Sequence, residues 1–449
     1  MKIRLSATQI ILLSFLGAIL LGSVLLSLPI SCASNKPPPY VDALFTATTA
    51  TCVTGLVVVP TVVHWSLFGQ IVILALIQIG GLGIITVMTG LSLLLQRKIG
   101  LADSVLIQDA FNLNSLSGLG TFVKKVIIGT FVIESIGALL YMFVFIPEYG
   151  TKGICISVFN AVSAFCNAGI DIIGEDSLAA YVNDPLINLV TCALIVIGGL
   201  GYIVWWDILR VFRQSRHKHG GPLRYLTLHS KIVLISTAVL IVGGAVLFLL
   251  FEYDNPATMQ GLSLWQKIQA ALFQSITTRT AGFFTIPQEK LTNASALSAL
   301  LLMFIGGSPV GTAGGIKTVT FAVLLAAAFS AVKGRNEVTL CRRTISKSTI
   351  HKAIGVTCMS FSIAFFSTVA LAYVSDASAL DILYETVSAT ATVGLSRALT
   401  PTLNVVGRLI ITATMYLGRV GPISLAVAFA FKKDTDNNIK MPTEDVRVG

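Results

Sequence analysis

The chain has 449 residues, of which 54% are hydrophobic and only 12% are charged. Soluble globular proteins carry about 25% charged residues, so this composition excludes an ordinary soluble protein and indicates a polytopic membrane protein. The net charge is +10, but no more than two basic residues stand side by side, which disfavours a nucleic-acid-binding protein.

Eight apolar stretches are long enough to cross a membrane, for which a helix needs about 20 mostly apolar residues. In chain order they cover residues 8–30, 66–95, 122–146, 186–209, 229–251, 295–330, 350–374 and 402–431. Four further apolar stretches are too short to cross, and each lies between two of the long ones. These cover residues 40–51, 153–165, 264–277 and 378–389, and we expect them to form pore half-helices.

A glycine follows each short stretch and recurs at intervals of 114, 113 and 112 residues. The four glycines are Gly55, Gly169, Gly282 and Gly394. Repetition at a fixed period indicates a repeated structural unit, here a span, a half-helix with a glycine loop, and a second span. Glycines in apolar spans usually serve helix packing, but four at such regular spacing disfavour that interpretation.

The glycine loops have the features of a cation selectivity filter. Irregular backbone at membrane depth is tolerated where it lines a cavity, its carbonyl groups can replace the hydration shell of an ion, and glycine permits the required backbone angles. We expect K⁺ at the carbonyls of four segments: Val53, Thr54 and Gly55; Asn167, Ala168 and Gly169; Thr280, Ala281 and Gly282; Thr392, Val393 and Gly394. The last segment matches the start of the TVGYG filter of potassium channels.

A second glycine cluster recurs in the second span of each repeat, at residues 79–83, 197–201, 305–315 and 417–422. The third cluster has five glycines and a proline in eleven residues, and such residues cost about 1 and about 3 kcal/mol each inside a helix. We expect it to break the span and to form a gate, with a static kink as the alternative. The predicted gate residues are Gly306, Gly307, Ser308, Gly311, Gly314, Gly315, Lys317 and Arg419.

Three charged residues, Glu134, Lys317 and Arg419, fall inside predicted spans, where charges are costly and are commonly functional. We expect Arg419 to face the pore below the filter as a barrier to ions. Alternatively, it pairs with carbonyls of the glycine-rich break or with Glu134. Lys317 ends the break and can anchor it, whereas Glu134 has no partner that the sequence identifies.

The distribution of basic residues predicts the orientation. Apart from Lys317 and Arg419, 22 of the Lys and Arg residues fall on the side opposite the glycine loops and seven on the same side. Because basic loops stay in the cytoplasm, we expect both termini to be cytoplasmic and the filter loops to enter from outside. Twelve carboxylates on the glycine-loop side form either an acidic vestibule that concentrates cations or ordinary solvated loops.

An enzyme is disfavoured. The seven cysteines form no close pair, so neither a zinc site nor a disulfide framework is indicated. The five histidines lie near span ends or in loops rather than in a cluster of catalytic groups.

The chain resembles the Trk/Ktr/HKT superfamily of potassium transporters, and in particular the bacterial Ktr-type membrane subunit, in four features taken together. These are the four filter segments, the paired IGGLG clusters, the break in the third repeat and the GRVGP of the fourth. The resemblance implies four M1–P–M2 units in pseudo-fourfold arrangement around one pore, and a homodimer with one pore per protomer. It implies that residues 306–315 form the gate and that Arg419 faces the pore. Some sodium-permeable plant members have a serine at the position of Gly55, so the glycine here implies selectivity for potassium.

The resemblance also implies a partner, a cytosolic ring of nucleotide-binding RCK subunits. This sequence has no βαβ region and no GxGxxG stretch, so ATP or ADP would act only through that separate subunit. No cofactor is expected on the chain itself, and Na⁺ is a modulator in the family.

We therefore predict an all-α polytopic protein of the bacterial cytoplasmic membrane, with four pore repeats at residues 1–95, 96–209, 210–331 and 332–449. The predicted function is that of the ion-translocating subunit of a K⁺ uptake system. The alternative is a sodium-permeable or sodium-coupled transporter on the same fold.

Overall fold

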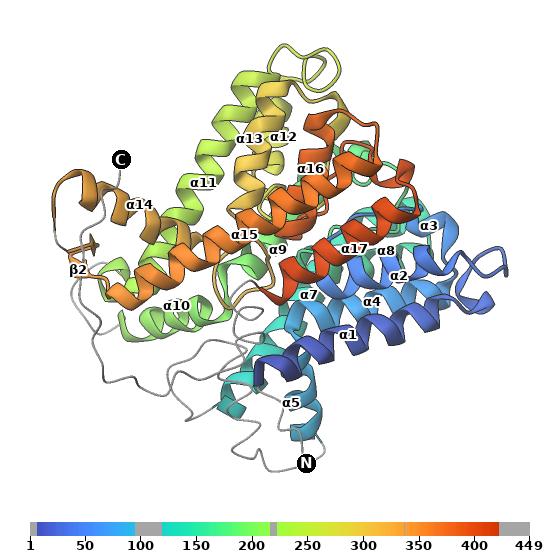
Figure 1. The fold of residues 1–449 in the computed structure, drawn as a ribbon. Coiled ribbons are helices and arrows are strands. Elements are labelled where there is room, and N and C mark those ends of the chain that lie inside the picture. The colour runs from blue at the N-terminus through green and yellow to red at the C-terminus, as the bar shows by residue number, and fades with distance from the viewer. Residues whose placement is uncertain (1–6, 95–118, 216–221, 336, 422–449) are drawn as a thin grey trace, which may run out of the picture.

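The computed structural model describes residues 7–94, 119–215, 222–335 and 337–421, and this part of the chain is almost entirely helical (Figure 1). The α-helices are α1 (Ala7–Leu26), α2 (Tyr40–Cys52), α3 (Thr61–His64), α4 (Leu67–Leu82), α5 (Ile84–Leu94), α7 (Leu119–Tyr149), α8 (Lys152–Cys166), α9 (Pro185–Leu200), α10 (Tyr202–Ser215), α11 (Leu228–Glu252), α12 (Leu264–Thr277), α13 (Asn293–Phe304), α14 (Thr318–Val332), α15 (Lys347–Val374), α16 (Ala379–Ala391) and α17 (Val405–Val420).

Short elements connect the helices. The 3₁₀ turns are Pro29–Ser31, Ala179–Tyr181, Pro222–Tyr225, Gln288–Lys290 and Thr400–Thr402. An antiparallel hairpin of β1 (Thr339–Leu340) and β2 (Arg343–Thr344) lies between α14 and α15. Its two turn residues, Cys341 and Arg342, both have positive φ angles, as a two-residue hairpin loop of the favoured hand requires.

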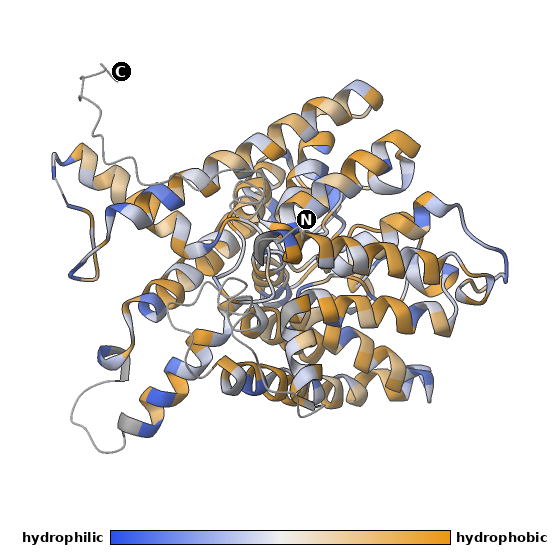
Figure 2. Ribbon diagram, turned by 60° about the horizontal axis from the view of Figure 1, so that its bottom comes forward, coloured by the Kyte–Doolittle hydropathy of each residue, from blue (hydrophilic) through white to orange (hydrophobic). Residues whose placement is uncertain are grey.

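Among the described residues, four helices are long and apolar enough to cross a membrane by themselves, namely α1, α7, α11 and α15. Large apolar side chains are exposed along them, for example Leu21, Phe131, Val239 and Phe366. Figure 2 shows hydrophobic residues along the helices and hydrophilic residues mainly at helix ends and in connections. A helical membrane protein has this distribution because lipid covers its outer surface.

The second spans expected at residues 66–95 and 186–209 are each bent in the middle. The chain bends by 97° between α4 and α5 and by 96° between α9 and α10. Each bend falls on a glycine with a positive φ angle, +84° at Gly83 and +89° at Gly201, a conformation that a side chain would oppose. Counting each bent pair as one span raises the number of candidate spans to six.

The other two second spans also end at their glycine clusters. The expected span at 295–330 is divided into α13 and α14 by an irregular segment, which we call the intramembrane loop and define as residues 305–317. Helix α17 ends at Gly421, which has a φ angle of +90°. The rest of the expected span, residues 422–431, lies outside the described residues.

The four short helices α2, α8, α12 and α16 cover the four short apolar stretches. Each packs against the long helix that precedes it, α1, α7, α11 and α15 respectively. Each also contacts the second helix of another unit: α4 packs on α8, α9 on α12, α13 on α16, and α17 on α2. In Figure 1 the last of these contacts places the blue α2 beside the red α17, so the circuit of contacts closes.

Candidate functional site

The four glycines that follow the short helices meet in a closed ring. A Cβ atom added to Gly55 would lie 2.4 Å from the carbonyl oxygen of Ala168. Cβ atoms added to the other three glycines would lie equally close to the next unit: Gly169 at 2.5 Å from Ala281 O, Gly282 at 2.8 Å from Val393 O, and Gly394 at 2.2 Å from Thr54 O. The ring therefore has no room for a side chain at any of its four corners.

The same contacts describe a ring of backbone oxygens. The carbonyl oxygen of the residue before each glycine faces a glycine of a neighbouring unit, and these four residues are Thr54, Ala168, Ala281 and Val393. Carbonyl oxygens in such a ring are the ligands that replace the hydration shell of an alkali cation in a potassium filter.

A strained residue starts each glycine turn. Val53, Asn167 and Thr392 are the C-caps of α2, α8 and α16, and all have left-handed backbone angles. Thr280, at the corresponding place after α12, has a φ angle of +72°. Left-handed angles are unusual for branched residues such as valine and threonine. Backbone strain of this kind persists where the surrounding structure fixes the conformation, and it is concentrated at functional sites.

Hydroxyl groups hold two of the turns in place. The amide of Gly55 donates to Thr49 Oγ1 at 2.9 Å, and the amide of Gly394 donates to Ser388 Oγ at 3.1 Å. Both acceptors lie six residues before the glycine. The sequence analysis did not include Thr49 or Ser388 among the site residues, although the threonine- and serine-rich runs before the glycines were the signal that could have identified them.

The intramembrane loop is closed at its base and attached to the second unit. Ile305 and Ile316 form a bridge at the base. The amides of Ser308 and Thr312 donate to the carbonyls of Gly199 and Gly198, at 2.9 and 3.2 Å. The glycines predicted for the gate allow close approach here, since a Cβ atom on Gly306 would lie 2.1 Å from Gly314 O and one on Gly311 would lie 2.9 Å from Gly198 O.

Thr312 connects the loop to the glycine turns, and the sequence analysis missed it. Its hydroxyl donates to the carbonyl of Phe165 at 3.0 Å and accepts from Asn167 Nδ2 at 3.2 Å. A second connection comes from the third unit, where the amide of Gly314 donates to Thr280 Oγ1 at 3.1 Å. The loop therefore lies directly against the turns that carry the carbonyl ring.

Arg419 joins the loop to the first unit. Its guanidinium donates to the carbonyl oxygens of Thr312 at 2.7 Å and of Gly80 at 2.6 Å. Lys317 Nζ donates to the carbonyl of Ala313 at 2.6 Å. This geometry favours the alternative in which Arg419 binds the break, and it places Lys317 as an anchor of the loop that it ends.

Glu134 on α7 is buried and does not contact Arg419. Its carboxylate accepts from Gln78 Nε2 at 3.3 Å and lies 3.8 Å from Cys166 Sγ. Cys166 immediately precedes Asn167, so the carboxylate lies beside the residue that comes just before the second glycine turn. The structure thus supplies the partners that the sequence did not identify.

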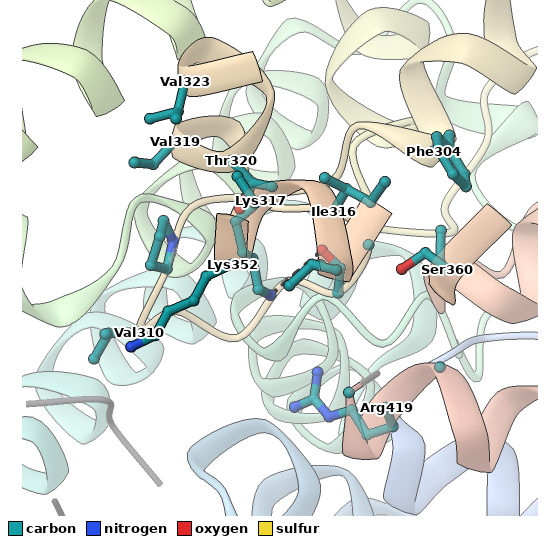
Figure 3. Close-up of a pocket in the computed structure, with 18 of the residues that line it drawn as sticks. Phe304, Val310, Ile316, Lys317, Val319, Thr320, Val323, Lys352, Ser360 and Arg419 are labelled. Carbon is teal, nitrogen blue, oxygen red and sulfur yellow. Dashed lines mark hydrogen bonds between the residues drawn. The ribbon is translucent and has the colours of Figure 1, made fainter. Parts of the chain in front are cut away.

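A cavity of about 800 Å³ adjoins the loop (Figure 3). Its walls come from the loop, from α10, α11, α13, α14 and α15, and from the ends of α16 and α17. They include Ile316, Lys317, Lys352, Thr390 and Arg419. Figure 3 draws Lys317, Lys352 and Arg419 among the lining residues, with Arg419 below the two lysines in this view. Thr390 and Ala391, at the end of the fourth short helix, line it together with residues of the loop.

One carboxylate lies close to the second glycine turn in the chain. Asp171 follows Gly169 by two residues, and its Oδ1 accepts from the amide of Ile173 at 3.2 Å. Burial raises the pKa of Asp171 to about 6. This carboxyl group therefore changes its charge near pH 6.

The helical architecture and the exposed apolar side chains of its long helices define a polytopic membrane protein. The sequence matches the TrkH family, described as cation transport proteins, over residues 7–441. The chain therefore belongs to the TrkH family of cation transport proteins, and the expectation of a transporter rather than an enzyme is confirmed.

Similar proteins match this chain over nearly its full length. The chain is 38% identical to the Ktr system potassium uptake protein B of Bacillus subtilis, covering 100% of this chain and 98% of that protein. It is 37% identical to the potassium/sodium uptake protein NtpJ of Enterococcus hirae, covering 99% and 98%. The crystal structure of the potassium transporter TrkH from Vibrio parahaemolyticus superposes with a TM-score of 0.74 at 17% identity, covering 95% of this chain and 86% of that one, which shows a common fold.

Proposed function

We propose that this chain is the ion-translocating subunit of a bacterial potassium uptake system and that K⁺ passes through the ring of four glycine turns. The observation that carries this proposal is the set of four backbone oxygens at Thr54, Ala168, Ala281 and Val393, each facing a glycine of the neighbouring unit. Uptake would be driven by the membrane potential, which supplies about 2.3 kcal/mol per elementary charge per 100 mV.

The proposal treats the chain as four repeats with boundaries at residues 1–95, 96–209, 210–331 and 332–449. The circuit of contacts from α4 to α8, α9 to α12, α13 to α16 and α17 back to α2 supports a pseudo-fourfold arrangement. Each contact joins the second helix of one repeat to the short helix of the next. In this arrangement the short helices are the pore half-helices that end at the filter.

The intramembrane loop is the proposed gate. It lies against two of the glycine turns through Thr312 and Gly314, and Arg419 ties it to the carbonyl of Gly80 on the other side. The two bonds of Arg419 would hold the loop in a closed position, and breaking them would release it. A barrier role of the guanidinium itself fits the same geometry because Arg419 also lines the cavity beside the loop.

A regulatory partner and a second copy of the chain belong to the same proposal. The relatives from Bacillus subtilis and Vibrio alginolyticus are named as components of a Ktr system, which supports a cytosolic RCK-type subunit that carries the nucleotide response. The excess of basic residues opposite the glycine turns supports cytoplasmic termini in the bacterial cell membrane, and the basic connections would be where that subunit docks. A homodimer with one pore per protomer, and modulation by Na⁺, complete the proposal.

The test is growth and potassium uptake in bacterial cells that lack their own potassium transporters, at low external K⁺ and with a matching RCK subunit co-expressed. Rescue by this chain supports the proposal. Sodium uptake measured in the same cells tests the alternative, for which the name of the Enterococcus hirae relative gives a reason. Good expression without rescue, together with Na⁺ uptake, would overturn potassium as the main ion.

A further inference from the structure

Arg279 is a buried arginine directly before the third glycine turn, and neither the carbonyl ring nor the cavity of about 800 Å³ accounts for it. The residue is 7% exposed and follows the end of α12 by two positions. The three ion pairs found among the described residues do not include it. Because a buried charge without a partner is costly, the surroundings of Arg279 must compensate its charge.

The space beside Arg279 is too small for a counter-ion. A second cavity, of about 10 Å³, is lined by Arg279 together with Gly199, Thr237 and Gly307, among others. This volume is at the lower limit for a single water molecule, so it leaves no room for an anion such as chloride. Within the described ranges, Arg279 Nε and Thr237 Oγ1 are buried without a hydrogen-bond partner. The compensation for the charge therefore comes from the protein backbone.

Three helices end beside Arg279. Gly199 in the last turn of α9 and Ile276 in the last turn of α12 line the small cavity with it. Helix α13 ends at Phe304, two residues before Gly306, and the carbonyl oxygen of Gly306 accepts a hydrogen bond from Arg279 Nη2 at 3.5 Å. The C-terminal end of a helix carries a partial negative charge and stabilises a cation. The ends of α9, α12 and α13 therefore supply the negative potential that the guanidinium needs.

Arg279 also joins the third glycine turn to the base of the intramembrane loop. Its guanidinium contacts Gly306, where the chain enters the loop. Where the chain leaves the loop, the amide of Gly314 donates to Oγ1 of Thr280, the residue that follows Arg279. The entering and leaving segments are in contact, since a Cβ atom on Gly306 would lie 2.1 Å from Gly314 O. Two adjacent residues of the third turn thus hold both segments of the base.

Arg279 and Arg419 contact different parts of the loop. Arg419 donates to the carbonyl of Thr312 in the middle of the loop, and it lines the cavity of about 800 Å³. Arg279 contacts Gly306 at the start of the loop, and it is not among the residues that line that cavity. The loop is therefore held at two separate places by two arginines of different units.

We propose that Arg279 is a positioning residue that holds the base of the intramembrane loop on the third glycine turn, with the ends of α9, α12 and α13 compensating its charge. Its effect on transport rests on the proposed function of the loop as a gate. When the base is released, the loop leaves the position described here more readily, and the maximal uptake rate rises. Because the helix ends act on the charge, Arg279→Lys should retain most of the interaction, whereas the uncharged variants Arg279→Gln and Arg279→Met should lose it.

The first measurement is amide hydrogen exchange, followed by mass spectrometry on the purified full-length protein in detergent, which does not depend on transport. The reporting amides are those of Ser308 and Gly314, which donate to Gly199 O and Thr280 Oγ1. We expect these amides to exchange about fivefold faster in Arg279→Gln and Arg279→Met, and within about twofold of wild type in Arg279→Lys.

Two of the variants serve as controls for folding. Arg279→Met replaces the buried charge with an apolar side chain of similar length, which avoids leaving an unpaired polar group in the interior. Lys267→Gln is the matched control, because Lys267 is also a buried cation of the third unit but donates to the carbonyl of Tyr253 instead of the loop. We expect this control to leave the exchange of the loop amides unchanged.

Two results of the exchange measurement overturn the proposal. One is loop exchange in Arg279→Met equal to that of wild type, which would show that the residue does not hold the loop. The other is an acceleration that extends equally to α1 and α15, which would show that Arg279 only stabilises the whole protein.

The second measurement is the maximal Rb⁺ uptake rate in the cells used to test the proposed function, with and without residues 307–314. Arg279→Met should raise the rate of the full-length chain and add nothing in the shortened chain, because the deletion already removes the part of the loop that Arg279 restrains. An equal rise in both backgrounds contradicts a role in the loop. Faster loop exchange without any rise in rate supports the positioning role and contradicts the gate, so the two proposals fail by different results.

Discussion

At the scale of single residues, the glycine turns have no space for a side chain at their glycines. A Cβ atom at Gly55 would lie 2.4 Å from Ala168 O and 3.1 Å from the Cα atom of Gly394, well inside normal contact distance. The φ angle of +99° at Gly55 adds backbone strain for any other residue. The four glycines were identified from spacing alone, because a requirement for glycine at a fixed interval is visible in a sequence.

Replacing Gly55 with serine should widen or distort the carbonyl ring and lower the selectivity for K⁺ over Na⁺. The measurement is the ratio of Rb⁺ to Na⁺ uptake in the rescued cells. Gly243→Ser is the matched control, because a Cβ atom there meets nothing within 4 Å. An unchanged ratio in Gly55→Ser protein that is expressed normally would contradict the assignment of the ring as the filter.

Replacing Arg419 with glutamine should remove at least one of the two bonds that join the loop to Gly80. A hydrogen bond from a charged group contributes about 1.5–3 kcal/mol, so we expect the maximal uptake rate to rise about tenfold if the closed loop is the barrier. Arg224→Gln, at an exposed position, is the control. A loss of folded protein without any rise in rate would instead assign Arg419 a purely structural role.

Asp171 should make uptake sensitive to pH. Its pKa is raised to about 6 by burial, so the carboxylate is charged at pH 7 and loses its charge as the pH falls through 6. We expect the apparent affinity for K⁺ to decrease over that interval in wild type, since a negative charge beside the path attracts cations. Asp171→Asn should show the low-pH affinity at every pH, and a wild-type profile in this variant would refute the assignment.

At the scale of elements, the short helices were predictable and the bends were not. Apolar stretches too short to cross a membrane, each followed by a glycine, gave α2, α8, α12 and α16 with bounds within two residues of those expected. The bends at Gly83 and Gly201 were missed because IGGLG is equally compatible with a continuous helix that packs closely on a neighbour. Only the third cluster, with Pro309 and five glycines, excluded a helix by its composition.

The contacts of Thr312 could not be predicted from the sequence for a different reason, since they join residues about 145 positions apart.

Deleting residues 307–314 should raise the uptake rate by removing the bonds of Ser308 and Thr312 to the bend between α9 and α10. The residues of the four glycine turns are themselves retained, so we expect the preference for K⁺ over Na⁺ to change less than the uptake rate. Uptake rate and ion preference measured together separate a gate from a structural kink. A rate equal to that of wild type, at equal expression, would leave the loop without a gating role.

At the scale of the whole molecule, the two ends of the described chain are joined. Helix α17 packs on both α1 and α2, and the guanidinium of Arg408 forms an ion pair with Asp42, which is largely buried. Membership of the TrkH family could be anticipated from the combined motifs, and the long-range closure of the structure agrees with it. The dimer and the regulatory ring involve surfaces outside this single chain, so they remain proposals.

The ion pair between Asp42 and Arg408 should stabilise the closed arrangement. Removing one partner from a buried pair leaves an uncompensated charge and costs about 3–5 kcal/mol, so Arg408→Leu should lower the midpoint of thermal unfolding measured by fluorescence-detected size exclusion. The double variant Asp42→Asn/Arg408→Leu should recover most of the loss. A double variant no more stable than the single one would show that the pair does not couple the two helices.

The intramembrane loop also has a consequence for how this architecture can change over time. Two of the four second spans turn sharply at a glycine, and within the described residues only the third opens into a loop of thirteen positions. In a channel assembled from four identical subunits, every substitution appears four times, so no quadrant can acquire a structural element that the others lack. Because one gene encodes all four quadrants here, a single quadrant can diverge to control flow while the other three keep the ring intact.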